Sequence, residues 1–95
     1  AEMGALLVDQ LQALRDKYPD VIEEVRGKGL MIGIVLKMPG LPVLQKAQEL
    51  GLLVNVVGGN IVRLVPPLVV TEDEIREAVN VLDQSIAAAA AALKQ

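Results

Sequence analysis

Residues 51–68, with the sequence GLLVNVVGGNIVRLVPPL, decide the fold of this chain. Two runs of aliphatic residues flank Gly58-Gly59-Asn60, and glycine and asparagine accept the positive φ angles that a hairpin tip requires. The second run ends at Pro66-Pro67, because proline cannot donate a hydrogen bond to a sheet. The pattern predicts a β-hairpin whose second strand carries a single cation, Arg63.

Before this hairpin, the spacing of apolar residues predicts a helix over residues 2–17 and a short strand over Val21–Val25. The near-continuous apolar run Leu30–Leu36 is typical of a central strand covered on both faces, and Gly33 within it indicates a bulge or a close backbone approach. A second, short helix then includes Val43, Leu44, Ala47 and Leu50 and is closed by Gly51.

After the hairpin, Thr71-Glu72-Asp73-Glu74 forms a capping box that begins a third helix. The resulting order is α-β-β-α-β-β-α with short connections. We therefore expect an α+β fold with a two-layer antiparallel sheet and helices on one face. At 95 residues, the chain is predicted to form a single domain over residues 1–95.

The composition excludes several classes of function. The net charge of -3 gives no basic surface for nucleic acid or for an anionic membrane. The sequence has no cysteine and no histidine, which removes the thiolate nucleophile and the commonest general base and metal ligand, so we expect no metal site. No apolar run approaches the length of a membrane span and no signal peptide is recognisable, so a cytoplasmic protein is expected.

Four short motifs have a functional and a structural interpretation. Arg26-Gly27-Lys28-Gly29 leads into a strand rather than a helix, which favours a turn with solvated cations over a phosphate loop. Glu23 and Glu24 would point to opposite sides of a strand, so they form no acid/base pair. Tyr18 is interpreted as a packing residue at a helix end. Arg63 lies among apolar neighbours, and its guanidinium suits a carboxylate. Two interpretations of Arg63 therefore remain open, a surface charge and a carboxylate-binding residue.

Four blocks of sequence, in this order, resemble the C-terminal small domain of class III aminotransferases such as the acetylornithine and ornithine aminotransferases. They are residues 25–34 (VRGKGLMIGI), 51–55 (GLLVN), 63–68 (RLVPPL) and 71–75 (TEDEI). The resemblance implies a homodimeric enzyme of fold type I that uses pyridoxal phosphate to exchange an amino group between an amino acid and 2-oxoglutarate. It also implies that Arg63 is the residue that binds a substrate carboxylate.

The resemblance further implies that the catalytic lysine and the cofactor-binding groups lie in a large domain that this chain lacks. We therefore expect an excised domain that is not an enzyme by itself, with no catalytic and no cofactor-binding residue of its own. The absence of Phe, Trp, His and Cys, together with the terminal alanine run, indicates an engineered or consensus-like sequence. Two alternatives stay open: self-association through the face that would meet the large domain, and residual binding of dicarboxylates.

Overall fold

The computed structural model describes residues 2–28, 31–52, 54–64 and 71–93. Its elements are α1 (Glu2–Lys17), β1 (Ile22–Lys28), β2 (Met31–Leu36), α2 (Leu41–Glu49), β3 (Val54–Val57), β4 (Ile61–Leu64) and α3 (Glu72–Leu93). The order α-β-β-α-β-β-α is the one predicted from the sequence, and the α+β class is confirmed. None of the helices within these ranges is long and apolar enough to cross a membrane.

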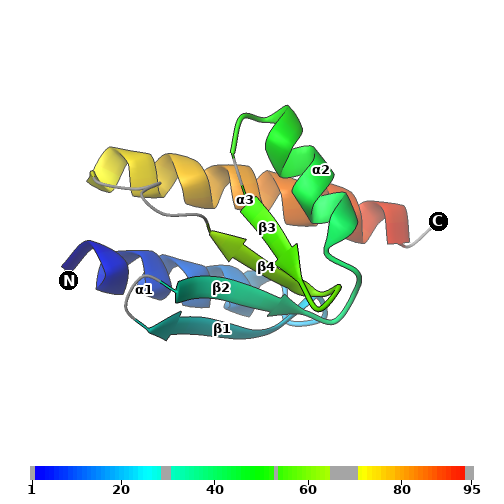
Figure 1. Ribbon diagram of the computed structural model, residues 1–95, viewed down its shortest axis with the longest axis horizontal. Coiled ribbons are helices and arrows are strands. Elements are labelled where there is room, and N and C mark those ends of the chain that lie inside the picture. The colour runs from blue at the N-terminus through cyan, green and yellow to red at the C-terminus, as the bar shows by residue number, and fades with distance from the viewer. Residues whose placement is uncertain (1, 29–30, 53, 65–70, 94–95) are drawn as a thin grey trace.

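The four strands form one sheet in the order β1-β2-β4-β3, and each neighbouring pair is antiparallel. The helices α1 and α3 run behind this sheet, and α2 lies beside β3 and packs on α3 (Figure 1). The sheet face opposite the core, which we call the open face, is covered by no helix of the described chain. The predicted central strand is confirmed, because β2 lies between β1 and β4 and its residues 32–36 are all buried, although no helix of the described chain covers the open face.

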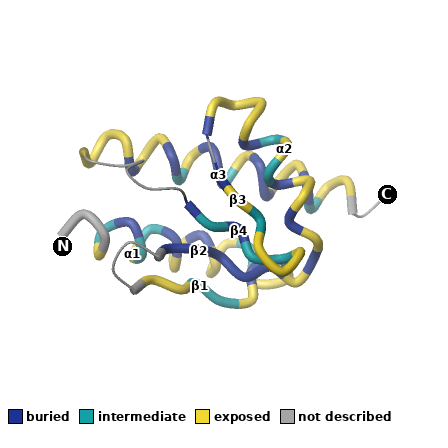
Figure 2. Tube along the Cα trace, viewed as in Figure 1, coloured by how far each residue is buried: buried dark blue, intermediate teal, exposed yellow. Residues whose placement is uncertain are grey.

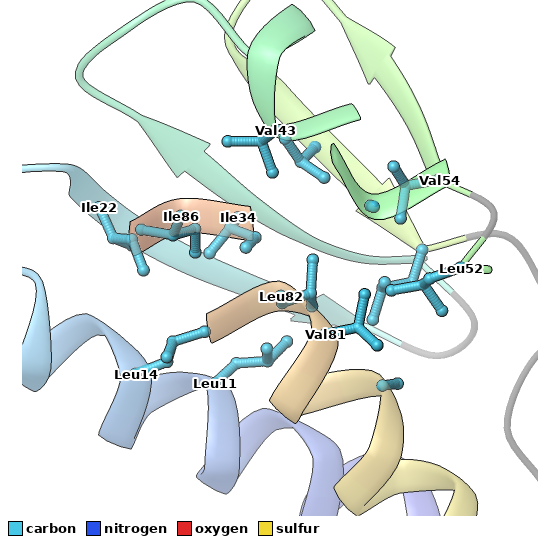
Figure 3. Packing of buried hydrophobic residues seen from close by; sticks show 14 of the residues in the cluster. Leu11, Leu14, Ile22, Ile34, Val43, Leu52, Val54, Val81, Leu82 and Ile86 are labelled. Carbon is cyan, nitrogen blue, oxygen red and sulfur yellow. The ribbon is translucent and has the colours of Figure 1, made fainter. Parts of the chain in front are cut away.

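The core lies between the sheet and the helices. Leu11 and Leu14 of α1 point toward Leu82 of α3, and Ile34 of β2 lies above them (Figure 3). These side chains are 0–4% exposed and belong to one continuous cluster of buried residues. With almost no aromatic side chain in the sequence, the cluster is built from many small aliphatic contacts, as the composition requires.

The central hairpin is confirmed. Val57 of β3 pairs with Ile61 of β4, and Gly58 and Gly59 at the tip have φ angles of 63° and 83°. Asn60 was expected to share this left-handed conformation, but it does not. Its amide Nδ2 instead donates to the Leu36 carbonyl at 3.0 Å, while the Leu36 amide donates to the Asn60 carbonyl at 2.9 Å, so Asn60 ties the tip to the end of β2.

The strand β1 is longer than Val21–Val25 and includes Arg26, Gly27 and Lys28. The prediction of a turn at Arg26-Gly27-Lys28 is therefore wrong. A side chain at Gly27 would collide with the Val8 side chain of α1, so this glycine allows the helix to approach the strand closely. Gly29 lies outside the described residues, and the irregularity in β1 falls between Ile22 and Glu24.

The helix ends follow the predicted signals. At the end of α2, Gly51 has φ 91°, and its amide and that of Leu52 donate to the Gln48 and Ala47 carbonyls, which is a Schellman motif. At the start of α3, the Glu74 amide donates to the Thr71 hydroxyl at 3.1 Å. The Glu74 carboxylate accepts from that hydroxyl rather than from the Thr71 amide, so the box closes through side chains. Pro66 and Pro67 lie outside the described residues.

Candidate functional site

The strand register fixes which side chains reach the open face. Ile34 pairs with Val62, and Val62 pairs with Val56; these three belong to the core or pack against it. Because side chains alternate between the two faces of a strand, the rows on either side of this one point away from the core. One row of the open face consists of Arg26, Gly33, Arg63 and Asn55. The other row consists of Glu24, Val35, Ile61 and Val57.

A shallow hollow of about 350 Å³ lies on the open face over Gly33. It is lined by Arg26, Gly27, Ile32, Gly33, Val57, Ile61 and Arg63. A Cβ atom added to Gly33 would lie 2.9 Å from the Val62 carbonyl oxygen and 3.4 Å from Cγ of Arg63. The close approach predicted at Gly33 is thus confirmed, and the missing side chain keeps the floor of the hollow open.

The two arginines flank Gly33 from the neighbouring strands, since Arg26 of β1 and Arg63 of β4 are both its cross-strand partners. Arg63 is half-buried, and no described side chain forms a hydrogen bond or an ion pair with it. Arg26 is exposed, and its Nε lies 3.2 Å from the Glu24 carboxylate. The hollow therefore has an apolar floor with a guanidinium on each side.

Sequence reasoning singled out Arg63 and assigned Arg26 to a solvated turn. The sequence separates these two residues by 37 positions, and only the pairing of β2 with both β1 and β4 places them on one face. The register of the second pairing depends on where the hairpin tip meets β2. The contact of Asn60 with Leu36 sets the position of the hairpin tip against β2, and no residue pattern in the sequence predicts this contact.

A second polar cluster joins α1 to α3, away from the hollow. The Tyr18 hydroxyl donates to Oδ1 of Asp83 at 2.5 Å, and Nζ of Lys17 donates to Oδ2 of the same carboxylate at 2.7 Å. Nζ of Lys17 also lies 5.4 Å from the centre of the Tyr18 ring. Tyr18 packs against the core as expected from the sequence, but its hydrogen bond to Asp83 was missed.

Each member of this cluster has a shifted pKa. Partial burial acts to raise the pKa of Asp83, but the hydrogen bonds from Lys17 and Tyr18 and the charge of Lys17 outweigh it, so the pKa is lowered. The hydrogen bond to Asp83 raises the pKa of Tyr18, with burial adding to it, and the same carboxylate raises the pKa of Lys17. The cluster thus favours a charged Asp83, a charged Lys17 and a neutral Tyr18, which is a structural arrangement of surface groups.

Pyridoxal phosphate attaches to a lysine, and three lysines whose side chains the structure describes, Lys17, Lys37 and Lys46, contact other groups. Lys17 contacts Asp83, Lys37 donates to the Pro19 carbonyl at 3.0 Å, and Lys46 lies 3.4 Å from the Glu49 carboxylate. None of these lysines lines the hollow over Gly33, and no acidic side chain does so either. Among the described residues there is also no group of acidic side chains placed to hold a metal ion.

Comparison with known sequences decides the family. A sequence model of the family described as Aminotransferase class-III matches residues 1–86. The chain belongs to the class III aminotransferase family. Members of this family are aminotransferases that depend on pyridoxal phosphate.

Among the relatives of this class III chain is the acetylornithine aminotransferase of Bacillus subtilis (strain 168). It is 48% identical over 88 residues, which is 92% of this chain and 22% of the relative. The mitochondrial acetylornithine aminotransferase of Neurospora crassa is 47% identical over 77 residues, or 81% of this chain and 17% of the relative. The chain therefore spans about a fifth of the length of the curated relatives it matches.

Solved structures of the family have the same fold over this segment. The acetylornithine aminotransferase from Elizabethkingia anophelis matches with a TM-score of 0.80 and 33% identity, over 92% of this chain and 24% of that one. The ornithine aminotransferase from Toxoplasma gondii, described with partial occupancy of pyridoxal phosphate at its active site, matches with a TM-score of 0.84 and 29% identity. That match covers 99% of this chain and 23% of the other.

Proposed function

We propose that this chain is the C-terminal small domain of an acetylornithine aminotransferase-like enzyme and that it is not catalytic by itself. In the complete enzyme, Arg63 would bind a carboxylate of the substrate. One observation carries this proposal: Arg63 stands on the open face beside the hollow, and no carboxylate within the described residues pairs with it. A planar guanidinium binds a carboxylate through two parallel hydrogen bonds, which fixes both its position and its orientation.

The complete enzyme would transfer an amino group from an acetylornithine- or ornithine-like substrate to 2-oxoglutarate. Pyridoxal phosphate, when bound, supplies the electron sink for such chemistry. The lysine and the phosphate-binding groups for that cofactor would come from the rest of the enzyme. The part of this chain would be to orient the substrate through Arg63, because a carboxylate fixed at one end places the reacting end against the cofactor.

A segment exchange tests the proposal. In the B. subtilis acetylornithine aminotransferase, the 88 residues that match this chain would be replaced by the chain itself, which gives a chimera. We expect the chimera to have transaminase activity, while the 95-residue chain alone, with pyridoxal phosphate added, forms no cofactor absorbance band of its own and transfers no amino group. Activity of the isolated chain would overturn the proposal that it is non-catalytic.

A second candidate function is self-association through the open face. The apolar row Val35, Ile61 and Val57 favours it, because Val57 is 40% exposed and Ile61 half-exposed on a face without a covering helix. Apolar surface of this kind is often covered by a partner. Sedimentation equilibrium over a range of concentrations tests this candidate. A dimer that Val57→Lys dissociates would support it, whereas a monomer at every concentration would remove it.

A further inference from the structure

We infer that Asn60 is a positioning residue for Arg63, because its side chain fixes the hairpin of β3 and β4 along β2 and so places Arg63 beside Gly33. The inference rests on the proposed function for the role of Arg63 and adds a residue that acts through it. Asn60 comes directly before β4 (Ile61–Leu64) and does not line the hollow. Its effect on the site is therefore exerted through the strand that carries Arg63.

The Asn60 side chain completes the ladder between β2 and β4. The three pairs of this ladder share one register, and Leu36 opposite Asn60 continues it. A hydrogen-bonded pair of antiparallel strands normally exchanges two backbone hydrogen bonds. Here the Leu36 amide donates to the Asn60 carbonyl at 2.9 Å, while the Leu36 carbonyl accepts from Nδ2 of Asn60 at 3.0 Å. One of the two bonds that close the ladder thus depends on a side chain.

The turn itself does not require an asparagine at this position. Asparagine is common at hairpin tips because it tolerates a positive φ angle. Gly58 and Gly59 provide the positive φ angles of this tip, and Asn60 has a negative one. The bond that the half-buried Asn60 side chain donates to Leu36 is therefore the physical reason for its amide group.

Burial alone does not fix the position of β4 along β2. Val62 and Leu64 are 0% and 5% exposed, and a slip of β4 by one residue would turn both to the open face. A slip by two residues keeps every side chain on its own face but moves Arg63 by about 7 Å along the sheet. In one direction it would place Arg63 opposite Val35, whose side chain occupies the space that Gly33 leaves open. The bond from Asn60 opposes this second kind of slip.

Steady-state kinetics of the chimera test the inference. Asn60→Ala removes the bond to Leu36, and Asn60→Asp keeps the size of the side chain while its ionised carboxylate cannot donate. Both variants should raise KM for the carboxylate-bearing substrates by about threefold to tenfold, the range that the loss of one neutral hydrogen bond covers. The value of kcat should stay nearly unchanged, because Arg63 binds the substrate and the transition state alike.

A double variant shows whether Asn60 acts through Arg63. In the Arg63→Gln chimera, adding Asn60→Ala should raise KM no further, because the side chain that Asn60 positions has been removed. Ser85→Ala is the matched control, since it also removes a side-chain bond to a backbone carbonyl, that of Val81 at 2.7 Å. Ser85 lies in α3 and does not line the hollow, so this variant should leave KM unchanged.

NMR of the 95-residue chain measures the strand position without any activity. Hydrogen-bonded and non-hydrogen-bonded pairs alternate along an antiparallel ladder, which makes Gly33 and Arg63 a non-hydrogen-bonded pair with Cα atoms about 4.5 Å apart. Their α protons should give a strong nuclear Overhauser effect in the wild-type chain. This effect should weaken in Asn60→Ala, with circular dichroism confirming that the variant is folded.

The outcomes distinguish the inference from the proposed function. If Arg63→Gln raises KM but neither Asn60 variant does, the inference is overturned and the role of Arg63 stands. An additive rise of KM in the double variant, an equal rise in Ser85→Ala, or an Overhauser effect that is undiminished in Asn60→Ala would also overturn it. If Arg63→Gln itself leaves KM unchanged, the proposed function fails, and the Overhauser effect still decides whether Asn60 positions the strand.

Discussion

Replacing Gly33 by alanine should destabilise the chain, because the structure has no space for the added methyl group. The new Cβ would lie 2.9 Å from the Val62 carbonyl oxygen, which real Cβ atoms essentially never approach so closely. The obstacle is a backbone atom of the neighbouring strand, so relief requires the β2–β4 pairing to shift. Overpacking of this kind costs about 1–3 kcal/mol. Alanine gains about 0.4–1 kcal/mol by restricting the unfolded chain, so the overlap should outweigh this gain.

Urea unfolding followed by circular dichroism would measure the effect, and the melting temperature should fall by about 4–8 °C per kcal/mol for a domain of this size. Gly27→Ala is the matched comparison, since its obstacle is the Val8 side chain rather than backbone. Val8→Ala should therefore offset much of the loss in Gly27→Ala, while Val62→Ala should not rescue Gly33→Ala. An unchanged midpoint for Gly33→Ala, or its rescue by Val62→Ala, would refute this reasoning.

Three further predictions concern single side chains. Thr71→Ala should cost about 1 kcal/mol of stability through the lost cap of α3, and Thr71→Ser should retain it; equal melting of all three proteins would contradict the cap. Because the pKa of Asp83 is lowered in the folded state, the stability that this carboxylate contributes is present above about pH 4 and is lost as the pH falls through the folded-state pKa. Asp83→Asn should therefore flatten the acid limb of the curve of unfolding free energy against pH. Parallel curves for the two proteins would argue against this role of Asp83. Arg63→Leu should be neutral or slightly stabilising in urea unfolding, since no described group pairs with Arg63; a loss above about 2 kcal/mol would show that it anchors a buried network.

Local signals in the sequence predict the elements well. Glycines at Gly58 and Gly59 fix the hairpin tip, Gly51 ends α2, and Thr71 begins α3, each through backbone chemistry that involves only neighbouring residues. The α+β arrangement then follows from the order of the elements. Local rules suffice here because each of these residues acts within one turn of the chain.

Contacts between distant residues could not be predicted in the same way. The sequence predicts a turn at Gly27, but this residue pairs with Ile32 as part of β1, and its missing side chain leaves space for Val8 of α1. Arg26 was placed in the same turn, and its position beside Gly33 depends on the register of β1 against β2. The bond between Tyr18 and Asp83 joins residues 65 positions apart. Such contacts depend on how the elements pack, which helical or strand periodicity does not encode.

The buried pattern of β2 illustrates the same limit. Its residues from Ile32 to Leu36 are all buried, and the sequence alone suggests cover on both faces (Figure 2). In the structure, Ile34 is buried in the core, whereas Val35 is 4% exposed and pairs on the open face with Ile61 and Glu24. Val35 is therefore buried on the open face beside the neighbouring strands of the same sheet. The apolar run alone would suggest a second layer of structure over that face.

The most direct test of the proposed role of Arg63 is the Michaelis constant of the chimera for its carboxylate-bearing substrates. Arg63→Gln should raise KM by about tenfold or more, because a hydrogen bond to a charged group contributes about 1.5–3 kcal/mol and each 1.4 kcal/mol is a factor of ten. Arg76→Gln, on the exposed side of α3, should leave KM unchanged. An unaltered KM in the Arg63→Gln chimera would contradict the assignment of Arg63 as the carboxylate-binding residue.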